Sequence, residues 1–300
     1  MTALHAAEAA VCRPTIPTTD PAIFTPPANA CDAHVHVFGD PAQYPYASER
    51  SFTPAPGQTL AALDALHGTL GFDRSVIVQS SVQGPAVMLD ALRAEPGRLR
   101  GVAVLKGDVS DGMLQELHEA GVRGVRVNLF QRGGVQVYRG GTTFADLEAI
   151  APRVQRYGWH VQAWLDADHL AQWAPRLLDL GLDIVVDHMG RITTDRGVES
   201  PGFQHLCTLL RNGRVWCKVS GADRISVAGA PYHDALPYAQ ALLAANAGRV
   251  VWGTDWPHVN YFDKPVPSDT GLVDLLPLIA PDSGDQHRLL VDNPQQLYGF

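Results

Sequence analysis

The feature that most constrains the fold of this 300-residue chain is a regular alternation of short apolar runs with amphipathic stretches. The runs are rich in β-branched residues, as strands are, and several of the stretches between them end in glycine, a common helix stop. The apolar runs cover residues 31–38, 74–80, 99–105, 122–130, 159–166, 182–188, 215–221 and 249–255. Strands that alternate with helices form parallel βαβ units, so eight of them predict an α/β protein whose sheet closes as a (β/α)8 TIM barrel.

The competing architecture is an open, doubly wound sheet. Such a sheet normally carries a glycine-rich phosphate loop after its first strand, whereas here the first strand ends in HVHVFG. We therefore expect a single barrel domain over residues 30–300. Residues 1–29 are rich in proline and threonine, which form helices and strands poorly, so we expect an extended N-terminal arm there.

Charge and composition exclude several classes of partner. The formal net charge is -8 and no block of Lys or Arg occurs, so neither nucleic acid nor an anionic membrane surface is expected as a partner. No apolar stretch reaches the length of a membrane span, and the first residues lack the basic start of a secretory signal. The four cysteines show no paired spacing, which favours a reduced, cytoplasmic protein acting on a small molecule. The oligomeric state stays open.

The first strand contains two histidines, at positions 34 and 36. In a regular strand, residues two apart point to the same face, which would place Asp32, His34 and His36 together and Ala33 and Val35 on the other side. Buried imidazoles are costly without partners. Because the active sites of TIM barrels lie at the C-terminal ends of the strands, this pair is a candidate functional group.

Other strands end in residues of the same kind. His188 closes the sixth strand and Asp255 closes the eighth. Taken singly, each has a purely structural alternative, such as a helix cap or a packed core histidine. Three histidines and an aspartate at one rim, where packing alone would favour Val or Ile, instead indicate a catalytic group made of His34, His36, His188 and Asp255.

Three arginines follow strand ends in an otherwise acidic protein. Arg126 and Arg132 belong to the fourth strand and the residues after it, and Arg224 follows the seventh strand. A guanidinium group binds a carboxylate with two parallel hydrogen bonds. Three such groups predict a substrate with two carboxylates.

These positions together resemble the amidohydrolase superfamily. The resemblance rests on His34-x-His36, on His188 and on Asp255. More narrowly, the segments CDAHVHVFG, SVIVQSSVQG, GVRGVRVNLF and WGTDWPHVNY resemble the 2-pyrone-4,6-dicarboxylate lactonase group, and the similarity runs from about residue 30 to the C-terminus.

The resemblance implies the substrate contacts. It implies that the three arginines bind carboxylates and that Ser81 and Asn260 contact substrate. His258, beside Asn260, and Trp164, at the end of the fifth strand, are expected in the same substrate-binding set. An aromatic side chain from the segment after the first strand is also implied, and Tyr46 and Phe52 both stay open for that place.

The sequence departs from the metal-dependent members of the superfamily. These usually supply a carboxylated lysine or a glutamate from the fourth strand and a histidine from the fifth, where this chain has Arg126 and Trp164. Neither side chain can donate a lone pair to a metal. We therefore expect that no metal is required. If one binds, the ligands are the four catalytic candidates, whose three imidazoles and one carboxylate suit a single Zn²⁺.

The resulting expectation is a hydrolase that opens the ring of 2-pyrone-4,6-dicarboxylate or a closely related di- or tricarboxylate lactone. The histidines donate hydrogen bonds to the developing oxyanion, and Asp255 accepts the proton of the attacking water. The alternatives are a metal-dependent lactonase of a sugar-acid or sulfonated lactone, and a Zn-dependent decarboxylase of the same superfamily.

Overall fold

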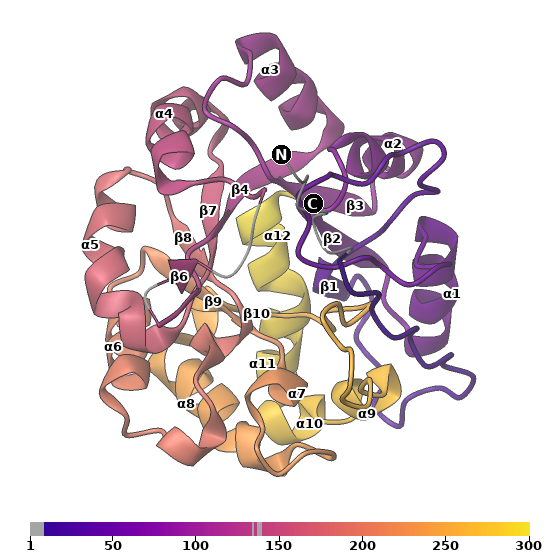
Figure 1. Ribbon diagram of the computed structural model, residues 1–300. Coiled ribbons are helices and arrows are strands. Elements are labelled where there is room, and N and C mark those ends of the chain that lie inside the picture. The colour runs from indigo at the N-terminus through magenta and orange to yellow at the C-terminus, as the bar shows by residue number, and fades with distance from the viewer. Residues whose placement is uncertain (1–8, 134, 137–139) are drawn as a thin grey trace, which may run out of the picture.

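Eight parallel strands form the centre of the molecule (Figure 1). The computed structural model describes residues 9–133, 135–136 and 140–300, without the side chains of residues 132 and 136. The strands neighbour one another in chain order: β1 Cys31–Val35, β2 Arg74–Val78, β3 Leu99–Ala103, β4 Val122–Asn128, β7 His160–Trp164, β8 Ile184–Val186, β9 Val215–Val219 and β10 Val250–Trp252. Each of the eight apolar runs of the sequence therefore contains one strand of the sheet.

The last strand returns to the first and closes the sheet into a barrel. Val35 pairs with Trp256 in a parallel bridge. The amide of His36 donates to the carbonyl of Trp256 at 2.8 Å, and the amide of Asp255 donates to the carbonyl of His34 at 2.9 Å. The predicted TIM barrel is confirmed, and its closure lies beside the candidate catalytic residues.

Helices surround the barrel (Figure 1). The longer ones are α1 Leu60–Leu70, α2 Ala86–Ala94, α3 Asp111–Ala120, α4 Phe144–Val154, α5 Leu170–Asp179, α6 Pro201–Arg211 and α8 Leu236–Asn246, and the shorter ones are α7 Ala222–Ile225, α9 Asp269–Val273, α10 Leu276–Ile279, α11 Ser283–His287 and α12 Asn293–Tyr298. A short antiparallel pair, β5 Gln131–Arg132 and β6 Val135–Gln136, follows β4. None of the described helices is long and apolar enough to cross a membrane.

Local sequence signals set several helix boundaries. The hydroxyl oxygens of Thr59 and Ser110 accept amide hydrogen bonds at the starts of α1 and α3. At the start of α4, Thr143 and Asp146 form a reciprocal capping box, which satisfies two amides that the helix leaves free. Gly71 ends α1 in the left-handed conformation that glycine adopts without steric cost. Gly71 is one of the glycine helix stops expected from the sequence.

Two groups of buried apolar residues lie on the two sides of the strands. The larger group joins strand residues such as Val35 to the helices, for example to Leu63 of α1. The smaller group includes Cys31, Ala33 and Trp216, and is joined by Tyr298 of α12. The strands are therefore packed on both faces, as parallel sheets require.

The first strand does not alternate as we expected. Its pairing with β2 shifts register between Asp32 and Val35. Ala33 packs with the smaller apolar group, and the Asp32 carboxylate lies 3.3 Å from His67 Nε2 of α1. The prediction that Asp32 shares a face with His34 and His36 is wrong, because a bulge reverses the alternation within the strand.

The described part of the N-terminal arm, residues 9–29, contains no helix or strand. It has one isolated bridge, between Val11 and Thr53. β1 begins at Cys31.

Candidate active site

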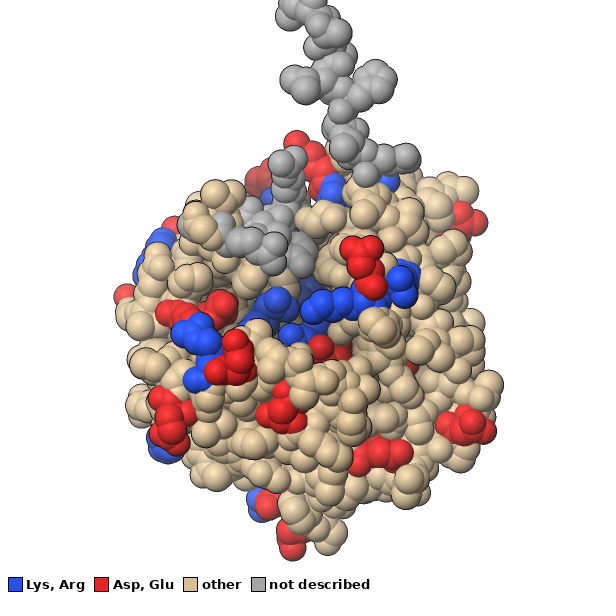
Figure 2. Space-filling view, turned by 60° about the horizontal axis from the view of Figure 1, so that its bottom comes forward, with Lys and Arg blue, Asp and Glu red and all other residues tan. Residues whose placement is uncertain are grey.

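A cavity of about 640 Å³ opens at the C-terminal ends of the strands. Eight of the eleven predicted site residues line it: His36, Ser81, Arg126, Trp164, His188, Arg224, Asp255 and Asn260. The face in Figure 2 is hollowed at its centre, where Lys and Arg side chains gather. A concave site with a few convergent polar groups is the arrangement expected for binding a small molecule.

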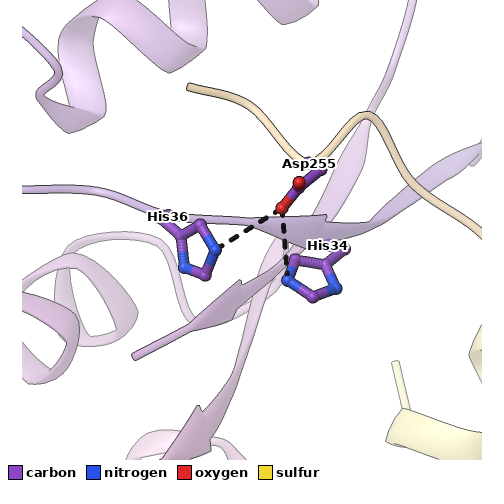
Figure 3. A group of neighbouring side chains, drawn as sticks. All are labelled: His34, His36 and Asp255. Atoms are coloured by element: carbon purple, nitrogen blue, oxygen red, sulfur yellow. Dashed lines mark ion pairs between the residues drawn. The ribbon is translucent and has the colours of Figure 1, made fainter. Parts of the chain in front are cut away.

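The three histidines converge on one oxygen of Asp255. Its Oδ1 atom lies 3.6 Å from Nε2 of His34, 3.6 Å from Nε2 of His36 and 3.8 Å from Nε2 of His188. Figure 3 shows the first two, from β1 and the residue after it, directed at the carboxylate from the loop after β10. All four side chains are at most 3% exposed.

The backbone around these residues is unusual for side chains other than glycine. His188 has φ 50° and Asp255 has φ 66°, both in the left-handed region. Residues held in that region cost of order 1–3 kcal/mol each and persist only where the surrounding structure fixes them. These left-handed residues follow the ends of β8 and β10, and both side chains line the cavity.

The second nitrogen of each histidine has its own partner. Nδ1 of His36 lies 2.6 Å from the carbonyl oxygen of Val78, and Nδ1 of His34 lies 3.4 Å from Oδ1 of Asp187. Because both partners are acceptors, these Nδ1 atoms carry hydrogens, and neutral rings then present lone pairs at Nε2. Nδ1 of His188 lies 2.9 Å from Oγ of Ser220, which can donate or accept.

This arrangement changes one expectation. A neutral His36 accepts at Nε2 and cannot donate to a substrate oxygen. It donates there only as an imidazolium, for which the Asp255 carboxylate at 3.6 Å supplies the opposite charge.

Arg224 holds the other oxygen of Asp255. Its Nε and Nη2 donate to Oδ2 at 2.9 and 2.6 Å, and its Nη1 donates to the carbonyl of Val259 at 2.9 Å. Burial alone would raise the pKa of Asp255, but the Arg224 charge, together with the histidines, holds it well below its usual range. Asp255 is therefore an anion across the physiological pH range. Arg224 lines the cavity as expected, but it also has a protein partner that the sequence did not reveal.

Burial favours the neutral forms of His34 and His188. It lowers the pKa of His188 to about 4 and that of His34 well below the ordinary value. A second buried carboxylate, Asp187, lies between His34 and Arg126. Burial would raise its pKa, but His34, Arg126 and Lys218 lower it strongly. The floor of the site thus carries two carboxylates among six cationic or potentially cationic groups: His34, His36, His188, Arg126, Arg224 and Lys218.

Arg126 is placed as a carboxylate-binding residue requires. Its side chain is 17% exposed, lines the cavity and lies with Nη2 3.4 Å from Asp187. Its Nε is buried and has no hydrogen-bond partner within the described part of the chain. A substrate carboxylate would satisfy that donor.

Three predicted residues fall elsewhere. His258 does not line the cavity: it is fully buried, with Nε2 2.9 Å from Oδ1 of Asp269. We correct its predicted substrate contact, because the left-handed turn at φ 58° sends the ring toward α9. His34 lies beneath the lining residues and reaches the site through Asp255. The side chain of Arg132 lies outside the described residues.

The two aromatic residues left open after β1 lie differently. Phe52 lines the cavity and is 4% exposed, whereas Tyr46 is not among the lining residues. Tyr46 instead packs beside the buried cluster that contains Phe52.

Sequence reasoning missed three cationic residues, of which Lys264 lines the cavity. Arg191 also lines the cavity, with its guanidinium 4.4 Å over the ring of Trp164. Arg191 lies only four residues after Asp187, which could have suggested that it belongs to the site. Its side chain reaches the cavity because the backbone is left-handed there, with φ 54°, and a sequence predicts that conformation only at glycine. Lys218 is wholly buried in β9 and donates to the carbonyl of Ala33 at 2.7 Å. A lysine within the apolar run VWCKVSG could have revealed it.

A metal would find suitable donors here. One nitrogen each of His34 and His36 and one oxygen of Asp255 lie within 4.8 Å of one another. The Nδ1 hydrogen bond of His36 to Val78, and the Asp187 carboxylate 3.4 Å from Nδ1 of His34, resemble the outer contacts that commonly orient metal-binding histidines. At the fourth and fifth strands, however, Arg126 and Trp164 offer no ligand.

Comparison with known proteins bears on this site. The amidohydrolase family model matches residues 31–300. A Comamonas testosteroni protein named 2-pyrone-4,6-dicarboxylate hydrolase is 42% identical over 286 residues, which cover 92% of each chain. A Hydrogenophaga intermedia protein named 4-sulfomuconolactone hydrolase is 35% identical over 93% of this chain and 92% of its own. The crystal structure of a probable 2-pyrone-4,6-dicarboxylic acid hydrolase from Acinetobacter baumannii, with citric acid bound, has a TM-score of 0.77 and 28% identity, over 91% of this chain and 100% of that one.

Proposed function

Because this chain belongs to the amidohydrolase family, we propose that it hydrolyses the ring ester of 2-pyrone-4,6-dicarboxylate or of a closely related di- or tricarboxylate lactone. The family membership agrees with the resemblance noted in the sequence. The observation that carries the proposal is the Asp255 carboxylate, fixed by Arg224 on one oxygen and faced by three histidines on the other, at the floor of a cationic cavity.

The side chains that line the cavity bind the substrate in this proposal. Arg126, Arg191, Arg224 and Lys264 all line it, beside Asp223, Asp255 and Asp263, and these four cations are the candidates for binding substrate carboxylates. Trp164 lies in the same wall with the Arg191 guanidinium over its ring, so the two side chains together form a surface for a planar, anionic ring. Ser81 and Asn260 supply neutral hydrogen-bonding groups that fix its orientation.

The chemical step begins with a water molecule beside Oδ1 of Asp255. The carboxylate accepts a proton as the water oxygen attacks the ring carbonyl carbon, and His36, in its imidazolium form, donates to the oxygen on which negative charge develops. Collapse of this intermediate breaks the bond to the ring oxygen. That oxygen leaves as an enolate, takes up a proton, and the product is an open-chain carboxylic acid.

We propose that this reaction proceeds without a metal, since Arg224 already occupies one oxygen of Asp255, and Arg126 of β4 and Trp164 of β7 offer no ligand. The same four residues, His34, His36, His188 and Asp255, would hold one Zn²⁺ in the alternative. The ion would then polarise the lactone carbonyl as a Lewis acid. A 4-sulfomuconolactone is a second candidate substrate, because the cationic wall suits a sulfonate as well as a carboxylate.

The deciding experiment is a lactone panel followed by ultraviolet absorbance, run on metal-analysed enzyme with and without chelator. It includes 2-pyrone-4,6-dicarboxylate, 4-sulfomuconolactone and a lactone without carboxylates. We expect turnover of the dicarboxylate to persist after chelation. One tightly bound metal equivalent whose removal abolishes turnover would overturn the metal-free mechanism. Turnover of the uncharged lactone alone would overturn the proposed substrate class.

Two further proposals concern the whole chain. We propose that residues 1–29 form an arm separate from a catalytic barrel at residues 30–300. We also propose a cytoplasmic location, because Cys12, Cys31, Cys207 and Cys217 are all free thiols in buried positions.

A further inference from the structure

The N-terminal arm joins two segments of the cavity wall that lie far apart in the sequence. On one side, the amide of Cys12 donates to the carbonyl of Thr53 at 2.8 Å, and the amide of Thr53 donates to the carbonyl of Ala10 at 2.8 Å. Thr53 Oγ1 also donates to the carbonyl of Ala9 at 3.0 Å. The arm thus pairs with the residue next to Phe52, which lines the cavity.

On its other side, the arm binds the segment that follows β10. The amide of Arg13 donates to the carbonyl of Tyr261 at 2.8 Å, and its Nε donates to the carbonyl of Phe262 at 2.6 Å. The amide of Asn260 donates to Sγ of Cys12 at 3.3 Å. Val259, Asn260, Tyr261 and Phe262 all line the cavity, four to seven residues after Asp255.

The arm also fills space between these segments. Cys12 is 3% exposed and packs in a small apolar cluster with Phe38, Phe52, Val82 and Val259. This cluster is separate from the two that hold the barrel together. It therefore supports the cavity wall rather than the barrel itself.

The segment after β10 needs such support. Asp255, His258 and Asn260 all have φ between 58° and 67°. These conformations are unfavourable for side chains other than glycine and persist only under external constraint. The hydrogen bonds that Cys12 accepts from Asn260, and that Arg13 donates to Tyr261 and Phe262, are constraints of this kind.

We propose that residues 9–13 are a positioning strap, which holds Phe52 and residues 259–262 in the geometry that binds substrate without touching the substrate itself. The kinetic part of this inference rests on the proposed hydrolase activity. The structural part does not, because the order of the two wall segments can be measured without substrate.

The test compares wild type with the double variant Cys12→Ala/Arg13→Ala and with Arg13→Ala alone. The single variant alters an exposed side chain, so it leaves the barrel core untouched. The matched control is Ile16→Ala/Ile23→Ala, which changes two exposed arm residues, at 53% and 92% exposure. Amide hydrogen exchange is followed first, and KM and kcat for the active lactone second.

We expect faster exchange at Thr53 and at residues 260–262 in the double variant, with unchanged exchange in the barrel strands. KM should rise by roughly three- to thirtyfold, which is the effect of losing one or two neutral hydrogen bonds. The change in kcat should be smaller. Arg13→Ala should raise the exchange rates and KM by smaller amounts. The control Ile16→Ala/Ile23→Ala should match wild type in both measurements.

Two results would overturn the inference. Exchange at residues 260–262 that equals wild type in the double variant would show that the arm does not order this segment, whatever the enzyme hydrolyses. Faster exchange with an unchanged KM would show that the strap has no part in substrate binding. If no lactone is turned over by wild type, the exchange result still decides the structural part, and the proposed function alone fails.

Discussion

At the scale of single residues, the site is organised around the charge of Asp255. Arg224 stabilises the carboxylate from one side, and burial favours the neutral forms of His34 and His188 on the other. A base must be unprotonated to accept the proton of water, and Arg224 ensures that it is. The same arginine lowers the basicity of the carboxylate, so in the proposed mechanism this pair sets the lowest pH at which the reaction proceeds.

The variant Arg224→Met tests this balance. Without the guanidinium, burial dominates and raises the pKa of Asp255, so the carboxylate takes up a proton at higher pH. We expect kcat of the variant to fall at a higher pH than kcat of wild type. The wild-type enzyme should stay active at pH values below the ordinary pKa range of a carboxyl group. The check is kcat against pH at saturating substrate, which separates this effect from the weaker binding. Coincident acid limbs in the two proteins would contradict the assigned coupling.

Arg126→Met tests carboxylate recognition. The variant removes a charge-assisted contact of about 1.5–3 kcal/mol, so kcat/KM should fall by roughly ten- to a hundredfold. The control is Arg93→Met on α2, whose side chain is 52% exposed and pairs with Glu116. Arg132→Met should also weaken substrate capture. A kcat/KM of Arg126→Met equal to that of the control would assign Arg126 to the fold alone.

Lys218 makes a prediction about stability. Burial lowers its pKa to about 8, whereas an unfolded lysine has a pKa of about 10.4. Between these values the unfolded chain binds more protons, so the Lys218 contribution to the free energy of unfolding rises with pH, by about 3 kcal/mol in total. Urea unfolding of wild type and Lys218→Met from pH 7 to 10 isolates this contribution as the difference between the two curves. Parallel curves would contradict the lowered pKa.

At the scale of elements, the sequence predicted the strands well and their ends poorly. All eight strands lie in the predicted runs because β-branched residues and periodicity report burial. The bulge in β1 and the left-handed turns at His188, Arg191 and Asp255 could not be predicted, since they arise from contacts between strands distant in sequence. The positions of strand ends were enough to group His34, His36, His188 and Asp255. The unpredicted turns explain why Arg191 was missed and why His258 was predicted to lie in the cavity.

Gly253→Ala tests the junction of β10 and β1. A Cβ atom at residue 253 would lie 2.6 Å from the amide nitrogen of His34, closer than a Cβ atom approaches a non-bonded heavy atom in proteins. The strands must separate, so we expect a loss of about 1–3 kcal/mol in unfolding free energy and a lower kcat, because His34 moves. Gly112→Ala on α3 is the control, since it has only a distant neighbour, and helix propensity predicts a slight gain. A Gly253→Ala protein as stable and active as wild type would show that the junction is not rigid.

At the scale of the whole molecule, the barrel closes where the chemistry is proposed. The hydrogen bonds that join β1 to the segment after β10 use the backbones of His34, His36 and Asp255. Fold stability and site geometry are therefore coupled at one seam. The net charge of -8 makes the cationic cavity stand out from the rest of the molecule, which favours anionic substrates inside it and not on the outer surface.

The central claim is that Asp255 takes the proton from water in a lactone hydrolysis, and Asp255→Asn tests it most directly. The measurement is kcat for 2-pyrone-4,6-dicarboxylate, together with calorimetric binding of the same lactone to the variant. Loss of general-base catalysis typically lowers the rate by about 10²–10⁴-fold. We predict a fall of that size, with binding by the arginines retained. An Asp255→Asn protein that binds the lactone and keeps a kcat near that of wild type would contradict the account and leave His188 as the next candidate base.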